Sequence, residues 1–306
     1  MTSRTSLISL MLVLLVGCRA STPEHQLSIR HADSVWQIAY ETHSDELAQA
    51  TLEPVLQNQI SSLYAHYSLD GANSWVHQFN RVTHTEQFEV ANEFSAVLRM
   101  VKVISDSAQG CFDISFKNQS TMRTKLDAEA FSSDNEHTAH HDKERFLAYG
   151  SFARKLDPTV KINLSSLFDS IASESIADFL IGKGIYNFRV SSGQVEIVSG
   201  KYKKNNISHT PHLPNAYTEA RKLTQGNFDQ LAAAKSTRYE HNQYASVGSP
   251  DKLKYAHQPA ITVYHDNAIR AQVWAHALAC LSEESRQLVA KGNNIQVVLE
   301  ETQKQG

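Results

Sequence analysis

The sequence predicts a mixed α/β (α+β) fold in one compact domain. Strand-like segments and segments with helical spacing of apolar residues interleave along the chain. No internal repeat or low-complexity linker divides it, and 306 residues suit one large domain or two closely packed halves. We therefore place a single domain at residues 18–306, after a short segment of different character at residues 1–17.

In the first half of the chain the pattern predicts a strand and two helices. Residues 35–40 alternate apolar and polar side chains, as an opening strand does. Residues 45–63 and 93–107 have apolar side chains every three or four positions, which favours helices. These apolar residues are Leu47, Leu52, Val55, Leu56, Ile60 and Leu63 in the first, and Phe94, Val97, Leu98, Val101 and Ile104 in the second.

In the second half the pattern predicts a helix, a hairpin and a final strand. The helix covers residues 165–182, and glycines at its end favour termination there. The hairpin pairs residues 186–191 with residues 195–198 around Ser192-Gly193-Gln194. Residues 261–264 form the last predicted strand, directly before the segment that carries the most informative motif.

Residues 1–17 have the pattern of a bacterial lipoprotein signal peptide. Arg4 precedes an apolar run at residues 7–16, too short for a spanning helix of about 20 residues. The run ends in Leu15-Val16-Gly17-Cys18, which is typical of a lipobox, and acyl chains on Cys18 would anchor the domain to a membrane. The alternative is an ordinary or uncleaved signal peptide. Arg19 rather than Asp after the cysteine favours the bacterial outer membrane, facing the periplasm.

Cys111 and Cys280 are the other two cysteines, and both lie among small or apolar residues. Buried free thiols are the default expectation for such cysteines. A disulfide between them is the alternative in an oxidising periplasm, but the sequence does not place them within bonding distance.

The charge of the chain gives no reason to expect nucleic acid as a partner. Lys and Arg number 29, Asp and Glu number 32, and the formal net charge is −3. Among 15 histidines, only His137, His140 and His141 form a dense group. An exposed zinc or copper site is one interpretation of this group. A solvated loop is favoured, because the flanking residues are polar and fix no geometry.

Six separated segments carry polar residues in a recognisable order. They contain Phe79-Asn80, Gly110-Cys111-Phe112-Asp113, Leu164-Ser165-Ser166, Asn187 with Ser192-Gly193-Gln194, Tyr239 with Tyr244 to Pro250, and Ala271-Gln272-Val273-Trp274-Ala275-His276-Ala277-Leu278. Together they span nearly the whole chain after Cys18. In this order they resemble the motifs of the ApbE-type FAD:protein FMN transferases.

The resemblance implies a fold, an activity and a set of site positions. Members of this family transfer FMN from FAD to a Thr or Ser of an acceptor protein, with Mg²⁺ as the metal. By family equivalence, FAD contacts fall on Cys111, Phe112, Asp113, Glu174 and Ser246. The metal positions fall on Ala177, Gln272 and His276, with Ala177 contributing through its backbone carbonyl. A flavin-acceptor protein or an envelope redox complex is the implied partner.

At most of these positions the chain departs from the family pattern. The metal-binding Asp and Thr have become Gln272 and His276. A Lys-Gly pair expected near the pyrophosphate has become Asp169-Ser170, the Gly-Gly-acid turn has become Ser192-Gly193-Gln194, and a His and an Asp have become Ser246 and Ser249. Mg²⁺ prefers an octahedral shell of oxygen ligands, whereas His suits zinc, copper or nickel.

Two interpretations of Gln272 and His276 follow: a site for a softer metal, or polar residues in a cleft that no longer binds metal. The second is favoured because the other losses point the same way. For the whole chain, lost or reduced FMN transfer is the leading hypothesis, and whether it is an enzyme is left open. A divergent active transferase and a non-catalytic envelope lipoprotein that binds flavin or protein are the alternatives.

Overall fold

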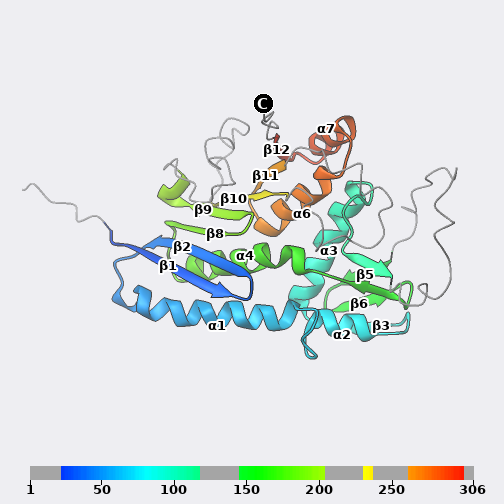
Figure 1. The fold of residues 1–306 in the computed structure, drawn as a ribbon, viewed down its shortest axis with the longest axis horizontal. Coiled ribbons are helices and arrows are strands. Elements are labelled where there is room, and N and C mark those ends of the chain that lie inside the picture. Colours follow the sequence, from blue (N-terminus) through cyan, green and yellow to red (C-terminus); the bar gives the residue numbers. More distant parts are fainter. Residues whose placement is uncertain (1–21, 118–144, 204–229, 237–260, 300–306) are drawn as a thin grey trace, which may run out of the picture.

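A seven-stranded antiparallel sheet with helices on one face forms the centre of the molecule (Figure 1). The computed structural model describes residues 22–117, 145–203, 230–236 and 261–299. The strand order is β1-β2-β8-β9-β10-β11-β12. These strands are β1 (Glu24–His31), β2 (Ser34–Glu41), β8 (Phe188–Ser192), β9 (Val195–Ser199), β10 (Gln230–Lys235), β11 (Ile261–His265) and β12 (Gln296–Leu299).

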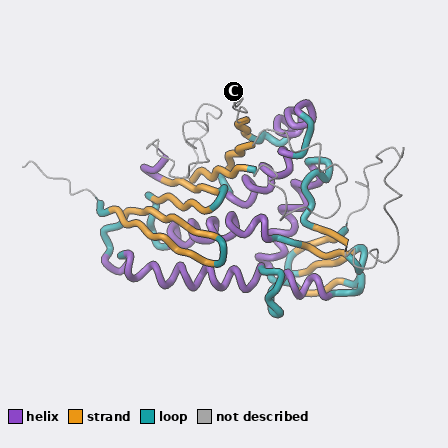
Figure 2. The backbone as a smooth tube through the Cα atoms, in the orientation of Figure 1, coloured by secondary structure: helices purple, strands orange, loops and turns teal. Residues whose placement is uncertain are grey.

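Three helices cover one face of this sheet: α1 (Gln49–Tyr67), α4 (Phe168–Gly182) and α6 (Ala268–Ala279). Helix α1 packs on β1, α4 on β8 and β9, and α6 on β10 and β11. Figure 2 shows a second group of elements at the end of the molecule away from β1 and β2. They include α2 (Trp75–Arg81), α3 (Asn92–Ser107), β3 (Gln87–Glu89), β5 (Phe146–Tyr149) and β6 (Phe152–Lys155).

Two further strands, a helix and three short turns complete the described structure. Strand β4 (Ser115–Lys117) pairs with β7 (Val160–Ile162), and α7 (Glu283–Gly292) follows α6. Short 3₁₀ turns lie at η1 (Asp45–Leu47), η3 (Ser165–Leu167) and η4 (Gly200–Lys203). In the described part of the chain, no helix is long and apolar enough to cross a membrane.

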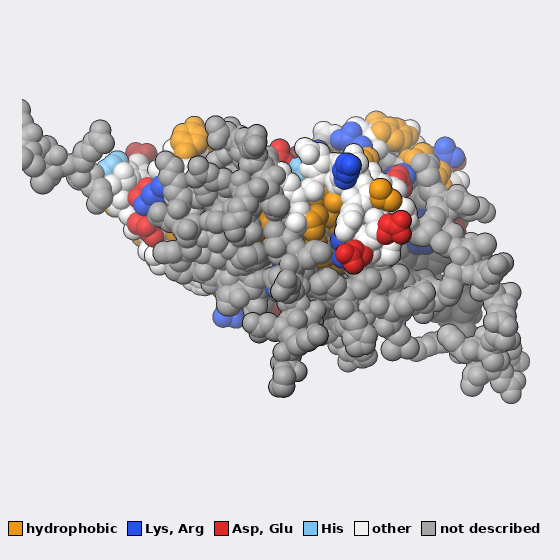
Figure 3. Space-filling view, turned by 90° about the horizontal axis from the view of Figure 1, so that it is seen from above, with side chains coloured by type: hydrophobic (Ala, Val, Ile, Leu, Met, Phe, Trp, Pro, Cys, Tyr) orange, Lys and Arg blue, Asp and Glu red, His pale blue; other side chains and the backbone are white. Residues whose placement is uncertain are grey.

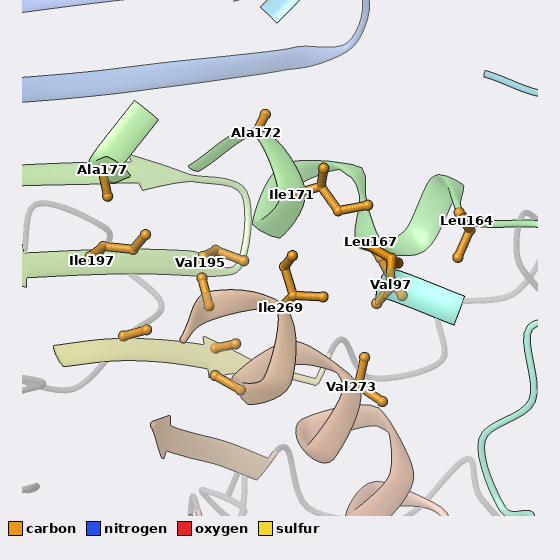
Figure 4. Close-up of a cluster of buried hydrophobic side chains, with 14 of the residues drawn as sticks. Val97, Leu164, Leu167, Ile171, Ala172, Ala177, Val195, Ile197, Ile269 and Val273 are labelled. Atoms are coloured by element: carbon orange, nitrogen blue, oxygen red, sulfur yellow. The ribbon is translucent and has the colours of Figure 1, made fainter. Parts of the chain in front are cut away.

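The core lies between the sheet and helices α4 and α6. Strands β8 and β9 alternate in their side-chain direction, so Val195 and Ile197 point from β9 toward the helices. Figure 4 shows them with Ile269 and Val273 of α6 and Ile171 of α4. Each of these side chains is at least nine-tenths buried. The space between β9 and helices α4 and α6 is therefore filled with hydrocarbon around these five side chains.

The mixed α/β class is confirmed, and so are the predicted elements. The helix expected at 45–63 is η1 followed by α1, that at 93–107 is α3, and that at 165–182 is η3 followed by α4. The expected hairpin is β8 and β9, paired with Ser192 opposite Val195.

Phe79-Asn80, one of the motif segments, lies in helix α2. Ser74 caps this helix, because its Oγ accepts a hydrogen bond of 2.9 Å from the backbone N–H of His77. The ring of Phe79 packs inward from this helix against Phe94 and Phe146.

Charged side chains on the face seen in Figure 3 are mixed in sign, with Lys and Arg lying beside Asp and Glu where residues are described. The described part of this face therefore carries both signs of charge, as does the composition of the whole chain.

Candidate functional site

Several of the polar residues singled out by the sequence lie on or against α6. Glu174 of α4 points at the start of α6, where its Oε2 accepts a hydrogen bond of 2.6 Å from the backbone N–H of Ala268. Its Oε1 accepts another of 3.1 Å from Gln230 Nε2. Asn267 caps the same helix by accepting from the N–H of Arg270 at 2.9 Å. Free N–H groups at a helix start attract a carboxylate in this way.

Burial dominates the electrostatics of Glu174. Its side chain lies under α6, and desolvation raises its pKa to about 7. The hydrogen bond from Ala268 opposes this rise, while the nearby carboxylate of Asp178 adds to it. Glu174, predicted as a flavin contact, therefore has its two oxygens engaged in holding α4, α6 and β10 together.

Ala177, one turn after Glu174, lies inside the continuous helix α4. Backbone carbonyls at such positions accept hydrogen bonds from the following turn. The methyl group of Ala177 is fully buried and points toward the strand that carries Ile197 (Figure 4). The environment of Ala177 is that of a packing residue.

Gln272 and His276 lie one turn apart on α6, as the sequence predicts. Gln272 is buried, and its Oε1 has no hydrogen-bond partner among the described residues. The same holds for Nε2 of His276. The His276 ring stacks on Phe112, with 5.2 Å between ring centroids and 14° between the planes.

Burial lowers the pKa of His276 to about 4, and a hydrogen bond with the Ser166 backbone opposes this shift only in part. His276 is therefore neutral at physiological pH. The neutral His276 ring stacks flat on Phe112, so its surroundings are apolar on that side.

The turn that carries Cys111, Phe112 and Asp113 packs against α6. Asp113 Oδ1 accepts hydrogen bonds of 2.7 Å from both the backbone N–H and the Oγ of Ser115. Its Oδ2 lies 3.3 Å from Arg145 Nη1. The carboxylate thus forms an Asx-type turn that starts β4. Asp113 therefore shapes the corner at which β4 begins.

Cys111 and Cys280 form a disulfide, with 5.9 Å between their Cα atoms. The default expectation of two buried free thiols was therefore wrong. The reason lies in the tertiary structure, since the turn after α3 and the C-terminal end of α6 are neighbours although 169 residues separate them in sequence. Both cysteines are partly exposed.

Asp169 and the β8–β9 turn, which belong to two separate sequence motifs, meet in the fold. Asp169 Oδ1 accepts a hydrogen bond of 2.6 Å from Ser34 Oγ. Its other oxygen lies so close to Gly193 that a Cβ there would collide with it. Burial raises the pKa of Asp169, and the Ser34 hydrogen bond opposes the shift. A carboxylate thus occupies the space beside the glycine turn.

Replacing Gly193 with Ala should destabilise the protein by roughly 1–3 kcal/mol. Gly193 has a φ of +53°, which disfavours side chains, and the added methyl would meet Asp169 Oδ2. Denaturant unfolding measures the loss. The matched control is Gly182→Ala at the end of α4, where a methyl meets nothing within 4 Å. Combining Gly193→Ala with Asp169→Ala should cost less than the sum of the two; strict additivity would contradict the contact.

These donors do not fit Mg²⁺. Gln272 offers one neutral oxygen, His276 offers a nitrogen, and Glu174 is held by Ala268 and Gln230. Among the residues that the structure describes, no group of three or more His, Cys, Asp or Glu side chains is arranged to hold a metal. An octahedral oxygen shell would need carboxylates that this face of α6 lacks.

Several predicted positions lie outside the described residues: Cys18, Ser246 and the group His137, His140 and His141. Within the described part, the sequence missed Gln230 and Asn267 as partners at the start of α6. Asn directly before a helical run is a capping pattern that could have indicated Asn267. No local pattern indicates Gln230, because it meets Glu174 only through the pairing of β9 with β10.

Two other residues that match the motifs form hydrogen bonds with backbone groups of the fold. Asn80 of α2 donates to the Ile162 carbonyl at 2.9 Å and accepts from the Ile162 N–H at 2.7 Å. Asn187 accepts a hydrogen bond of 2.9 Å from the backbone N–H of Lys201. Asn80 thus satisfies backbone groups of β7, and Asn187 satisfies one in the turn η4.

Comparisons with known proteins show the family and the fold of this chain. A model of the ApbE family matches residues 32–299. An FAD:protein FMN transferase of Vibrio cholerae serotype O1 is 21% identical over 306 residues, covering 94% of this chain and 90% of the relative.

Solved structures show the same fold. The flavin transferase ApbE from Vibrio cholerae matches with a TM-score of 0.63 at 18% identity, covering 91% of this chain and 93% of that one. The flavinyl transferase ApbE of Pseudomonas stutzeri, in its apo form, matches with a TM-score of 0.63 at 15% identity, covering 92% and 96%. Since the family model spans most of its length, the chain belongs to the ApbE family.

Proposed function

We propose that this chain has lost Mg²⁺-dependent FMN transfer and acts in the bacterial envelope as a lipid-anchored binding protein on an ApbE scaffold. The observation that carries the proposal is the pair at the metal positions. Gln272 and His276 provide no charge to the site, and His276 is neutral and stacked on Phe112. Transfer in this family uses a metal to neutralise a pyrophosphate, and these side chains cannot hold that metal.

The division between matching and altered residues supports the same proposal. Asn80, Asp113 and Asn187 match the family motifs, and each makes hydrogen bonds that shape a corner of the fold. The altered positions are those whose role in the family is toward metal or nucleotide. A sequence that keeps the residues shaping its corners and changes its metal and pyrophosphate contacts is expected to keep the fold without the reaction.

Asp169 opposes pyrophosphate binding in addition. It replaces a family lysine, and its carboxylate is buried beside Gly193 and bonded to Ser34. A phosphate approaching this turn would meet negative charge or a protonated acid where the family offers a cation. This second change would impair transfer even if a metal were bound elsewhere.

Incubation of the full chain with FAD, Mg²⁺ and an acceptor domain tests the loss of transfer. We expect no fluorescent flavin band on the acceptor after denaturing electrophoresis. The Vibrio cholerae FAD:protein FMN transferase, run in parallel, verifies that the acceptor is competent. A covalent flavin band formed by this chain, and abolished by Gln272→Ala, would overturn the proposal.

The binding role has two forms, and the effect of FAD on the melting temperature distinguishes them. If the scaffold binds flavin, FAD raises the melting temperature of the protein whether Mg²⁺ or EDTA is present. If it binds only protein, FAD has no effect on the melting temperature. A rise that requires Mg²⁺ would indicate that metal-dependent nucleotide binding survives, which contradicts both forms.

The membrane anchor rests on the lipobox at Leu15-Val16-Gly17-Cys18. Expressed in a bacterial envelope with labelled fatty acid, the wild-type chain should carry label and fractionate with outer membranes. Cys18→Ser should lose both properties. Label retained by that variant would place the lipid elsewhere and remove this part of the proposal.

A further inference from the structure

The disulfide joins the turn between α3 and β4 to the C-terminal end of α6. These are the two parts of the fold between which Phe112 stacks on His276. Cys111 lies in the turn between α3 and β4, and Cys280 is the C-cap residue directly after α6. The next residue after Cys111 is Phe112, whose ring lies flat on His276. The bridge therefore holds the Phe112 side of the contact against the α6 side.

On its own side, the turn is held without the bridge. The N–H of Cys111 donates to the Ala108 carbonyl at 3.1 Å, and Gly110 donates to Ser105 at 2.7 Å. Asp113 fixes the start of β4 through Ser115. Opening the disulfide breaks none of these hydrogen bonds.

The end of α6 is likewise held without the bridge. Arg286 of α7 donates from Nε to the Leu278 carbonyl at 2.9 Å and from Nη2 to the Leu281 carbonyl at 3.0 Å. These bonds satisfy carbonyls that a helix end leaves free. Reduction would consequently leave each side folded and change only how firmly one is held to the other.

The turn also contains backbone strain that an open bridge can relieve. Gln109 has a φ of +58° and is followed by Gly110 at +71°. A non-glycine residue with a positive φ is higher in free energy, and the surrounding structure must hold it in that conformation. Removing one of those restraints favours movement of the turn away from α6.

We propose that the Cys111–Cys280 bridge is a site of reversible thiol–disulfide exchange with a dithiol, and that its reduction uncovers His276. A thiolate of the dithiol attacks one sulfur, forming a mixed disulfide and releasing the other cysteine as a thiolate. The second thiol of the dithiol then attacks the mixed disulfide. Two electrons pass to the bridge, both cysteines gain protons, and the dithiol becomes a disulfide. The inference does not depend on whether FMN transfer is lost.

The atoms that would be uncovered are specific. Nε2 of His276 is buried and has no hydrogen-bond partner among the described residues. While the bridge is closed, this nitrogen is screened from solvent reagents. If the Phe112 turn withdraws, Nε2 becomes a neutral acceptor open to an incoming donor or electrophile.

The test uses diethylpyrocarbonate, which modifies accessible neutral imidazoles, on the full chain at fixed pH. Oxidised protein and protein reduced with dithiothreitol and then alkylated are compared, and mass spectrometry locates the modified residues. We expect the rate at His276 to rise severalfold on reduction, while exposed His84 is unchanged. Cys111→Ser with Cys280→Ser should show the raised rate with or without reductant.

Two further measurements complete the test. Phe112→Ala, with the bridge intact, should also raise the rate at His276, because the ring itself covers the imidazole. Far-ultraviolet circular dichroism should be unchanged by reduction. Equal His276 rates in oxidised and reduced protein would overturn the proposal, and so would a bridge that dithiothreitol reduces only when the protein unfolds.

Discussion

Changing Glu174 to Gln is expected to remove a fall in stability of roughly 3 kcal/mol that the wild-type protein shows between about pH 4.5 and pH 7. Burial raises the pKa of Glu174 to about 7, above its ordinary value of 4.5. Between these pH values the folded protein holds a proton that the unfolded chain has released. The free energy of unfolding therefore decreases as pH rises through this window and levels off above it.

Denaturant unfolding at a series of pH values measures this effect as a difference between wild type and Glu174→Gln. The Gln side chain retains an acceptor for the Ala268 N–H, so the cap on α6 is kept. Glu53→Gln on the exposed surface of α1 is the matched control and should leave the profile unchanged. A difference between wild type and Glu174→Gln that is constant from pH 4.5 to pH 8 would show that Glu174 does not titrate as described.

His276 should give a pH dependence of the opposite sign. Burial lowers its pKa to about 4, from an ordinary value of 6.5. The unfolded chain binds a proton between these values and the folded protein does not, so stability is complete above pH 6.5. It falls toward pH 4 by an amount on the order of 2–3 kcal/mol.

His276→Phe isolates this contribution, because a phenyl ring retains the stack on Phe112 but cannot titrate. Relative to wild type, this variant should gain stability as the pH falls from 6.5 to 4. His84→Gln, at an exposed position, controls for the loss of a histidine. Parallel profiles for wild type and His276→Phe would mean that the ring is protonated in the folded state, which would contradict its place in an apolar wall.

Periodicity predicted the frame of the fold because burial of one helix face or one strand face is a local constraint. The apolar spacing of residues 93–107 gives α3, and Gly193 gives the turn between β8 and β9. Strand β1 was missed although Leu27 and Ile29 alternate with exposed Gln26 and Ser28. Its polar face makes such a strand hard to distinguish from a loop before its partner β2 is known.

The site was predicted only in part, because its decisive contacts join residues far apart in sequence. The pairing of Gln272 with His276 follows from helical spacing. The stack of His276 on Phe112, the approach of Asp169 to Gly193 and the engagement of Glu174 by Ala268 depend on how α4, α6 and the α3–β4 turn pack. The disulfide belongs to this second class, since no local pattern places Cys111 beside Cys280.

The glutamate at 174 shows how a family position can change its role. Sequence resemblance placed it at a nucleotide contact, whereas its two oxygens receive hydrogen bonds from Ala268 and Gln230. Restoring Gln272→Asp and His276→Thr adds oxygen donors to α6 but leaves Glu174 and Asp169 as they are. We therefore expect that double variant to gain metal affinity without gaining FMN transfer.

The loss of the Mg²⁺ site is tested most directly by titrating the full chain, with FAD present, with Mn²⁺ as a paramagnetic substitute. Electron paramagnetic resonance reports the concentration of free Mn²⁺. The account predicts that wild-type protein leaves the free Mn²⁺ signal equal to that of buffer with FAD alone. Removal of one Mn²⁺ per chain from solution by the wild-type protein, with release on Gln272→Ala, would contradict it.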